Sequence, residues 1–202
     1  MNQVNYVNEK HAWEKFIHGD DQALAFLYSA HIDRLYNYGR QFTSNKSIVK
    51  DAIQDVFYEL IDRRGRISHA NSPKAYIYAC LRRRIIELLN KENSIVDLAS
   101  KEDSFFVSID PQAFFIDPQF SIDQKKLLEE HCNVLPRRQR EIIILRFFEQ
   151  MAYDEIAEIL GLANAKTVRT MMYRGLNKLS SSLTPYKSKL LLFLLMYDMQ
   201  LP

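Results

Sequence analysis

One stretch, from residue 135 to 179, constrains the fold more than any other, because it places an amphipathic helix, a glycine and a basic helix in succession. One buried helical face is indicated by the i, i+3, i+4, i+7 spacing of Tyr153, Ile156, Ala157 and Leu160. Gly161 supplies the left-handed residue that ends such a helix. Because Ala157 and Gly161 are small, two helices can cross here over a short turn.

A second helix is predicted directly after this turn, with Asn164 as its N-cap. It carries polar and basic side chains at the positions Lys166, Thr167, Arg169, Thr170, Tyr173, Arg174 and Lys178. A helix-turn-helix with a basic second helix is typical of proteins that read the DNA major groove. The alternative is an ordinary helical hairpin with a solvated basic face.

The segments LPRRQREIIILRFFEQMAYDEIAEILG and TVRTMMYRGLNKL resemble region 4 of the bacterial sigma-70 family of RNA polymerase sigma factors, in its extracytoplasmic-function (ECF) branch. That resemblance implies that the second helix reads the −35 promoter element and that the polymerase beta flap is a partner. Val168 lies seven residues after Gly161, where the family usually has six, so a turn one residue longer is expected.

Composition favours an all-α chain, because 47% of the 202 residues are apolar, glycines number only five and the long patterns have a 3.6-residue period. We expect two small helical domains joined by an extended acidic linker. The predicted segments are a region 2 domain at 1–91, the linker at 92–126, a region 4 domain at 127–184 and an apolar tail at 185–202. Trp13 and His31 are interpreted as packing residues of the first domain.

A helix predicted at about 47–63 has an apolar stripe and an opposite acidic ridge of Asp51, Asp55, Glu59 and Asp62. Like charges at this spacing repel unless a cationic partner meets them, but a plainly solvated face is the ordinary interpretation of such a ridge. The segment DAIQDVFYELI resembles sigma region 2.2, which grips the clamp of the polymerase beta-prime subunit. The resemblance assigns that contact to Asp51, Gln54, Asp55 and Phe57.

Seven basic residues and no acid lie between residues 63 and 86, with two tyrosines among them. Cations attract phosphates, and aromatic rings stack on unpaired bases, so this composition suits single-stranded DNA. The segment NSPKAYIYACLRRRIIELLNK resembles sigma regions 2.3 and 2.4, with departures at Arg83, Glu87 and Asn90. The predicted −10 recognition and melting surface comprises Arg63, Arg64, Arg66, Lys74, Tyr76, Tyr78, Arg82, Arg83, Arg84 and Glu87.

Seven acids against Lys101 alone, two Asp-Pro steps and five phenylalanines mark residues 92–123 as a linker. It is either a solubilising tether or, as the resemblance implies, an acidic strand that enters the basic polymerase channel. The C-terminal apolar run contains Leu190, Leu191, Leu192, Phe193 and Leu194. This tail either packs back onto the preceding domain or docks a partner, an anti-sigma factor or a DNA-targeting recruitment protein.

Catalysis has little support, since the histidines are scattered and neither a nucleophile motif nor a glycine-rich phosphate loop is present. Two distant cysteines indicate neither a disulfide framework nor a metal site, and no cofactor is expected. The longest apolar run is too short to span a bilayer, so a cytoplasmic protein without membrane insertion is predicted.

The predicted function is that of an ECF sigma factor, which binds core RNA polymerase and promoter DNA in double- and single-stranded form. Two alternatives remain. One is a polymerase-bound adaptor that a separate targeting protein brings to DNA, and the other is a dimeric helix-turn-helix regulator.

Overall fold

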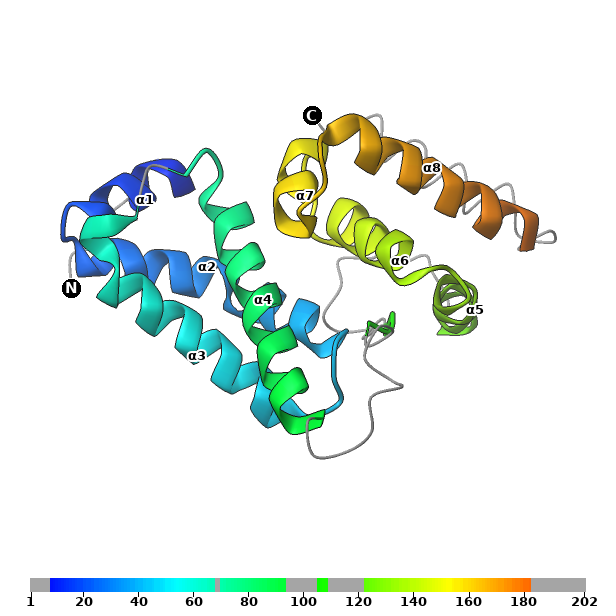
Figure 1. Cartoon of the computed structure of the whole chain (residues 1–202), viewed down its shortest axis with the longest axis horizontal. Helices are drawn as coiled ribbons and strands as arrows, with labels where there is room; N and C mark the ends of the chain where they lie inside the picture. Colours follow the sequence, from blue (N-terminus) through cyan, green and yellow to red (C-terminus); the bar gives the residue numbers. More distant parts are fainter. Residues whose placement is uncertain (1–7, 68–69, 94–104, 109–121, 183–202) are drawn as a thin grey trace. The chain divides into compact units, whose positions relative to one another are not determined.

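The structure is a computed structural model and describes residues 8–67, 70–93, 105–108 and 122–182. Throughout these ranges the regular elements are helices, and no strand occurs among them (Figure 1). The chain divides into two compact units. Unit 1 comprises Met1–Arg40 and Ser44–Asp97, and unit 2 comprises Gln41–Thr43 and Leu98–Pro202. The prediction of an all-helical chain with two helical domains is therefore confirmed.

The first element of unit 1 that the structure describes is a short helix. The elements of this unit are α1 (Glu9–Ile17), α2 (Asp21–Arg40), α3 (Lys46–Asp62), η1 (Arg64–Arg66) and α4 (Pro73–Asn93). The Asn8 side chain caps α1 by accepting a hydrogen bond from the His11 amide. Trp13 is only 1% exposed, and its ring contacts Tyr76 of α4 at a centroid distance of 5.4 Å. Trp13 thus anchors α1 in the core, as predicted.

His31 is buried in α2 and contacts Glu9 of α1, with 3.4 Å between His31 Nε2 and Glu9 Oε2. This interaction lowers the pKa of the Glu9 carboxyl, while desolvation opposes the shift and Lys74 and Arg34 assist it. The interpretation of His31 as a packing residue is confirmed, and its contact helps to hold α1 on α2.

Helices α2, α3 and α4 pack around one apolar core, and Gly39 of α2 lies against side chains of α3 and α4. A Cβ atom at Gly39 would lie 2.6 Å from Val49 Cγ1 and 3.1 Å from Ile85 Cδ1. The apolar stripe predicted for α3 faces this core, to which α2 and α4 also contribute. Its fully or nearly buried members include Leu27, Leu35, Val56, Leu60, Ile77, Leu81 and Ile85.

Unit 2 contains a compact array of helices around the predicted helix-turn-helix. Its elements are α5 (Ile122–Asn133), α6 (Arg137–Ile143), the π-helical turn η3 (Ile144–Phe148), α7 (Tyr153–Leu160) and α8 (Ala165–Ser182). Helix α4 extends to Asn93 and α5 begins at Ile122, so both enter the stretch predicted as linker. Unit 2 also contains Cys132, whose burial raises the pKa of its thiol to about 12.

Arginines of α6 hold the ends of neighbouring helices in unit 2. Arg140 is 2% exposed and donates from Nη1 to the carbonyl oxygens of Asn133 and Leu135, at 3.0 and 2.7 Å. Arg138 donates to the carbonyl of Leu160, the last residue of α7, at 2.7 Å. A basic side chain satisfies carbonyl groups that a helix end leaves without partners. None of the helices in the described ranges has the length and apolar character of a membrane span.

Replacing Gly39 with Ala should lower the free energy of unfolding of unit 1 by about 1–3 kcal/mol, because the added methyl group overpacks the contact with Val49. The better helix propensity of Ala offsets only about 1 kcal/mol of the cost. Urea unfolding followed by the fluorescence of Trp13, the single tryptophan of the chain, measures this change. Gly65→Ala is the matched control, because no atom lies within 4 Å of a Cβ there. Equal effects of the two substitutions would contradict the packing argument.

Candidate nucleic-acid interface

The corner between α7 and α8 has the geometry that the sequence predicts. Gly161 adopts φ 62° and ψ 38°, in the left-handed region that favours glycine. Asn164 caps α8, because its Oδ1 accepts a hydrogen bond from the Thr167 amide at 2.9 Å and from the Thr167 hydroxyl at 3.2 Å. Helix α8 begins at Ala165. Both predictions, the glycine corner and the asparagine cap, are confirmed.

Tyr153 supports α8 from the first turn of α7. Its hydroxyl donates to Met172 Sδ at 3.2 Å, and the guanidinium carbons of Arg146 and Arg169 lie 4.4 and 4.8 Å from its ring centroid. Arg146 is 1% exposed and also donates to the Met151 carbonyl at 2.8 Å. The ring therefore connects a buried cation to an exposed cation of α8, and each cation is attracted to its π face.

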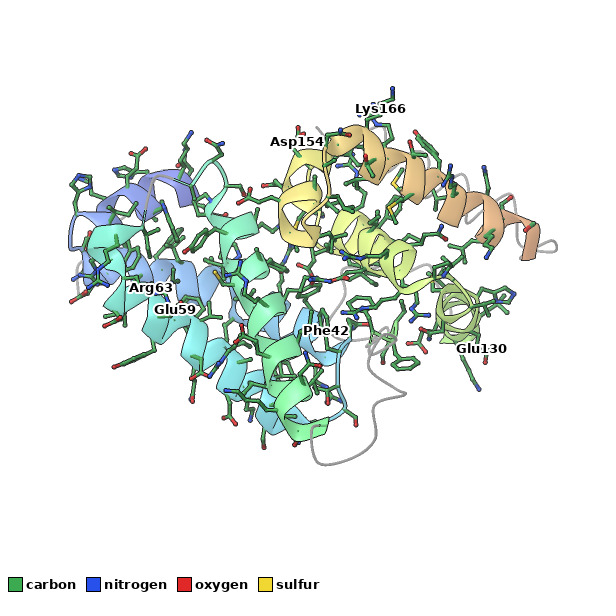
Figure 2. The ribbon with its side chains drawn as sticks, in the orientation of Figure 1. Phe42, Glu59, Arg63, Glu130, Asp154 and Lys166 are labelled. Atoms are coloured by element: carbon green, nitrogen blue, oxygen red, sulfur yellow. The ribbon has the colours of Figure 1, made fainter. Side chains whose placement is uncertain are left out.

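Polar and basic side chains cover the outer face of α8, while Val168, Met172, Leu176 and Leu179 are buried. Figure 2 shows Lys166 extending away from the ribbon near the start of this helix. Thr167 is half-buried at the corner, and the other predicted residues are exposed: Lys166, Arg169, Thr170, Tyr173, Arg174 and Lys178. The structure thus brings all seven onto one helix with their side chains accessible or partly accessible.

The two tyrosines of α4 have different environments. Tyr76 is half-buried against Trp13, whereas Tyr78 is 0% exposed and packs on Tyr38 at a centroid distance of 5.2 Å. Residues two positions apart on a helix point in different directions, so both rings cannot share one surface. The expectation that Tyr78 stacks on unpaired bases is therefore corrected, because its ring belongs to the core.

Several of the basic residues predicted to bind DNA form ion pairs with acidic side chains. Arg63 Nη2 lies 2.9 Å from Glu59 Oε1, and Figure 2 labels both residues. Arg64 pairs with Asp21 and lies over the ring of Phe16. The remaining members are placed at the surface or partly buried: Arg66, Lys74, Arg82, Arg83 and Glu87. The sequence did not predict these pairs, because Glu59 and Asp21 lie outside the basic stretch.

Arg84 of α4 pairs with Asp55 of α3 and so joins two of the predicted surfaces. Its Nε donates to Asp55 Oδ2 at 2.8 Å, its Nη2 lies 2.6 Å from the same oxygen, and its Nη1 lies 3.3 Å from Glu87 Oε2. The hydrogen bond to Asp55 is the largest influence that raises the pKa of Arg84. A residue predicted to bind polymerase is thus paired with a residue predicted to bind DNA.

The face predicted to contact polymerase has exposed aromatic and apolar members that the sequence reasoning did not select. Asp51 and Gln54 are exposed, but Phe57 is 7% exposed and packs on Tyr28 at a centroid distance of 5.0 Å. The next residue, Tyr58, is 73% exposed, and Ile61 is 51% exposed. Phe57 is therefore a core residue, which corrects its assignment to a direct contact.

The predicted partner-binding tail, from Leu190 to Leu194, lies outside the described residues. In the part of the chain that the structure describes, no group of three or more His, Cys, Asp or Glu side chains has the arrangement of a metal site.

Comparison with known families gives two matches in the expected order. Residues 27–95 match the family profile "Sigma-70 region 2", and residues 127–179 match "Sigma-70, region 4". The chain belongs to the sigma-70 family. The region 2 match covers α3, α4 and most of α2, and the region 4 match covers the helix-turn-helix.

Individual relatives support the ECF branch. The sigma factor is 29% identical over 154 residues to RNA polymerase sigma factor SigV of Bacillus subtilis. The aligned region covers 76% of this chain and 87% of SigV. It is 25% identical over 168 residues to ECF RNA polymerase sigma factor SigK of Mycobacterium sp. strain KMS. The aligned region covers 81% of this chain and 84% of SigK.

Two solved structures share the fold of this sigma factor. CnrH, in complex with the cytosolic domain of CnrY, aligns with a TM-score of 0.60 and 18% identity over 88% of this chain and 97% of CnrH. Sigma factor RpoE of Bartonella quintana, in complex with the anti-sigma factor NepR, aligns with a TM-score of 0.56 and 23% identity. This alignment covers 81% of this chain and 95% of RpoE.

Just before α7, Gln150 has φ 56°, a conformation that costs side-chain-bearing residues free energy. Gln150→Gly should therefore stabilise unit 2 of the sigma factor by about 0.5–1 kcal/mol. Hydrogen exchange of the α7 and α8 amides measures the change. Gln139→Gly, in the interior of α6, should destabilise unit 2 by about 1 kcal/mol. A destabilising effect at both positions would show that the backbone at Gln150 is not strained.

Proposed function

We propose that this chain is an ECF-type initiation factor that binds core RNA polymerase, recognises −35 DNA with α8 and opens −10 DNA at a surface that includes α4. The observation that carries the proposal is the presence of both sigma-70 domains, in order, on one chain. The alternatives of an adaptor and a dimeric regulator are not favoured, because the relatives are named as RNA polymerase sigma factors.

For −35 recognition, the exposed face of α8 provides the donors that major-groove binding needs. Arg169 and Arg174 can bond base edges or phosphates, and Tyr153 restricts where the Arg169 guanidinium lies. Since a tightly held side chain loses less conformational entropy on binding, this contact favours Arg169 as a base-reading residue.

For −10 melting, we propose the accessible residues of the predicted surface and exclude the buried Tyr78. Tyr76 is the aromatic ring at the edge of this surface, and its half-buried contact with Trp13 limits how much of its face a base could cover. The retained basic members are Arg63, Arg64, Arg66, Lys74, Arg82, Arg83 and Arg84, together with Glu87. Their charges favour phosphate contacts, which makes the binding salt-dependent.

For polymerase binding, we propose Asp51 and Gln54 together with Tyr58 and Ile61, which are exposed on the same helix. An exposed aromatic ring beside acidic groups is a favourable anchor for a basic protein surface. We infer that the protein works in the cytoplasm as a non-catalytic factor. CnrH and RpoE are each bound to another protein in their structures, and we propose that this chain also has an anti-sigma partner.

The direct test is transcription in vitro with purified core RNA polymerase and DNA from upstream of the gene. The expected result is a defined transcript that requires this chain. If the chain neither co-purifies with core polymerase nor directs a transcript from any tested promoter, the proposed function is wrong.

Arg169→Ala should weaken binding of the holoenzyme to −35 DNA by about 1–3 kcal/mol, if Arg169 contacts a base. Titration of promoter fragments that differ only in the −35 element measures the loss and its sequence dependence. Lys50→Ala, which removes an exposed cation of α3, is the control. A loss that is uniform across sequences would reassign Arg169 to phosphate positioning.

Tyr58→Ala should reduce affinity for core polymerase by about 1–2 kcal/mol without destabilising unit 1, since the side chain is 73% exposed. Phe57→Ala should instead destabilise unit 1, because its ring is in the core. Fluorescence anisotropy with labelled chain and core polymerase measures the affinity. Val134→Ala, at a 79% exposed apolar residue of unit 2, is the control. An equal loss with this control would contradict a specific role for Tyr58.

A further inference from the structure

Helix α1 lies before the region 2 match, which begins at residue 27, yet it contacts residues predicted to bind −10 DNA. Figure 1 shows α1 beside the end of α3, where η1 begins. Trp13 and Phe16 are one turn apart on α1, 1% and 0% exposed, and their ring centroids lie 5.7 Å apart. Because both rings are buried, α1 presents a fixed aromatic surface to the elements packed on it.

Phe16 and Asp21 hold the guanidinium of Arg64, the first residue of η1. The Arg64 guanidinium carbon lies 4.9 Å from the Phe16 ring centroid, and Nη2 donates to Asp21 Oδ1 at the start of α2. The side chain of Arg64 is 21% exposed, whereas that of Asp21 is 84% exposed. A guanidinium that is attracted to a ring face and bonded to a carboxylate has little freedom to turn toward a phosphate. These contacts therefore fix η1 on α1 and α2.

The turn that Arg64 begins leaves its neighbours accessible. The amides of Arg66 and Ile67 donate to the Arg63 carbonyl at 2.7 and 3.1 Å, and the side chains of Arg63 and Arg66 are exposed. A three-residue 3-10 turn has too few hydrogen bonds to keep its orientation by itself. Its orientation thus depends on the contacts that Arg64 makes with α1 and α2.

Trp13 holds a second residue of the predicted −10 surface. Its ring meets that of Tyr76, in the first turn of α4, at a centroid distance of 5.4 Å and an interplanar angle of 60°. The Ser72 hydroxyl accepts a hydrogen bond from the Ala75 amide at 3.1 Å and so caps this turn. Burial raises the pKa of the Tyr76 phenol, and Cys80 raises it further. Tyr76 is thus constrained at its ring and at its hydroxyl.

From these contacts we infer that Phe16 and Asp21 are positioning residues for −10 recognition, which act through Arg64 on the turn η1. Arg64 thereby has a different part from Arg66 in the predicted surface, because Arg64 orients the turn and Arg66 is exposed on it. The inference rests on the proposed function. It assigns roles to two residues that lie outside the region 2 match.

The first test uses hydrogen exchange of the free, full-length protein. Phe16→Leu keeps an apolar side chain but removes the ring face under Arg64. The amides of Arg66 and Ile67 should then exchange about fivefold faster, the change expected on loss of one cation–π contact. Phe57→Leu is the matched control, because it removes a ring from the core of the same unit, where that ring packs on Tyr28. Equal exchange of the two amides in both variants would show that Phe16 does not hold η1.

The second test uses Asp21→Asn, because positioning and direct phosphate binding by Arg64 predict opposite effects of this substitution. Helix α2 should remain intact, since Asp20 provides its cap by accepting from the Gln22 amide at 2.9 Å. We expect the holoenzyme to discriminate less between promoters that differ at one −10 base. Such discrimination is ordinarily about 5- to 150-fold, and it should fall by about threefold or more. Asp33→Asn, at another exposed acid of α2, changes the net charge equally and should leave discrimination unchanged.

Phe16→Leu should lose discrimination in the same assay, and thermal unfolding of each variant checks that unit 1 remains folded. Tighter binding by Asp21→Asn with unchanged discrimination would overturn the inference. A salt dependence steeper by about 0.7 would accompany that result, because Arg64 would then contact a phosphate that Asp21 keeps it from in the wild type. Equal losses in Asp21→Asn and Asp33→Asn, or no loss in Asp21→Asn, would overturn it as well.

Failure of the proposed function gives a different result, in which wild-type chain does not bind core polymerase at all. The exchange measurement is made on the free protein, so it reports whether Phe16 holds η1 independently of that outcome.

Discussion

The arrangement of unit 2 depends on the contacts of one ring, that of Tyr153. Arg146, Arg169 and Met172 all meet it, and they come from η3 and α8. Burying the Arg146 cation costs free energy unless its charge is stabilised and its N–H donors have acceptors. The Tyr153 ring stabilises the charge, and the Met151 carbonyl accepts a hydrogen bond from the guanidinium. The ring thus fixes the start of α7 against α8, and Gly161 and Asn164 then set the direction in which α8 leaves the corner.

Unit 1 uses charge differently, through pairs at its surface. Arg63 with Glu59 and Arg64 with Asp21 are exposed or partly exposed, so each contributes little to stability. Their larger consequence is for DNA binding, because a paired arginine presents less net charge to a phosphate than an unpaired one. The effective positive charge of the predicted −10 surface is therefore smaller than the count of basic residues in the sequence indicates.

Local features could be predicted from the sequence, and contacts between distant segments could not. The Gly161 corner, the Asn164 cap and the buried stripes depend on residues within one or two turns, so periodicity identifies them. Motif and residue type place Tyr78 and Phe57 on binding surfaces, yet each ring faces the core, because neither signal gives the direction in which a helical side chain points. The pairs Asp55–Arg84 and Asn133–Val107 join residues far apart in sequence. Periodicity within a single sequence does not predict such contacts.

The Asp55–Arg84 pair affects how mutational data on this protein should be interpreted. A substitution of Asp55, a residue predicted to bind polymerase, would also remove one of the two acids that pair with Arg84, a residue predicted to bind −10 DNA. Epistasis between these two positions would then resemble an overlap of the two binding surfaces. Its cause would be one carboxylate that serves a neighbouring helix.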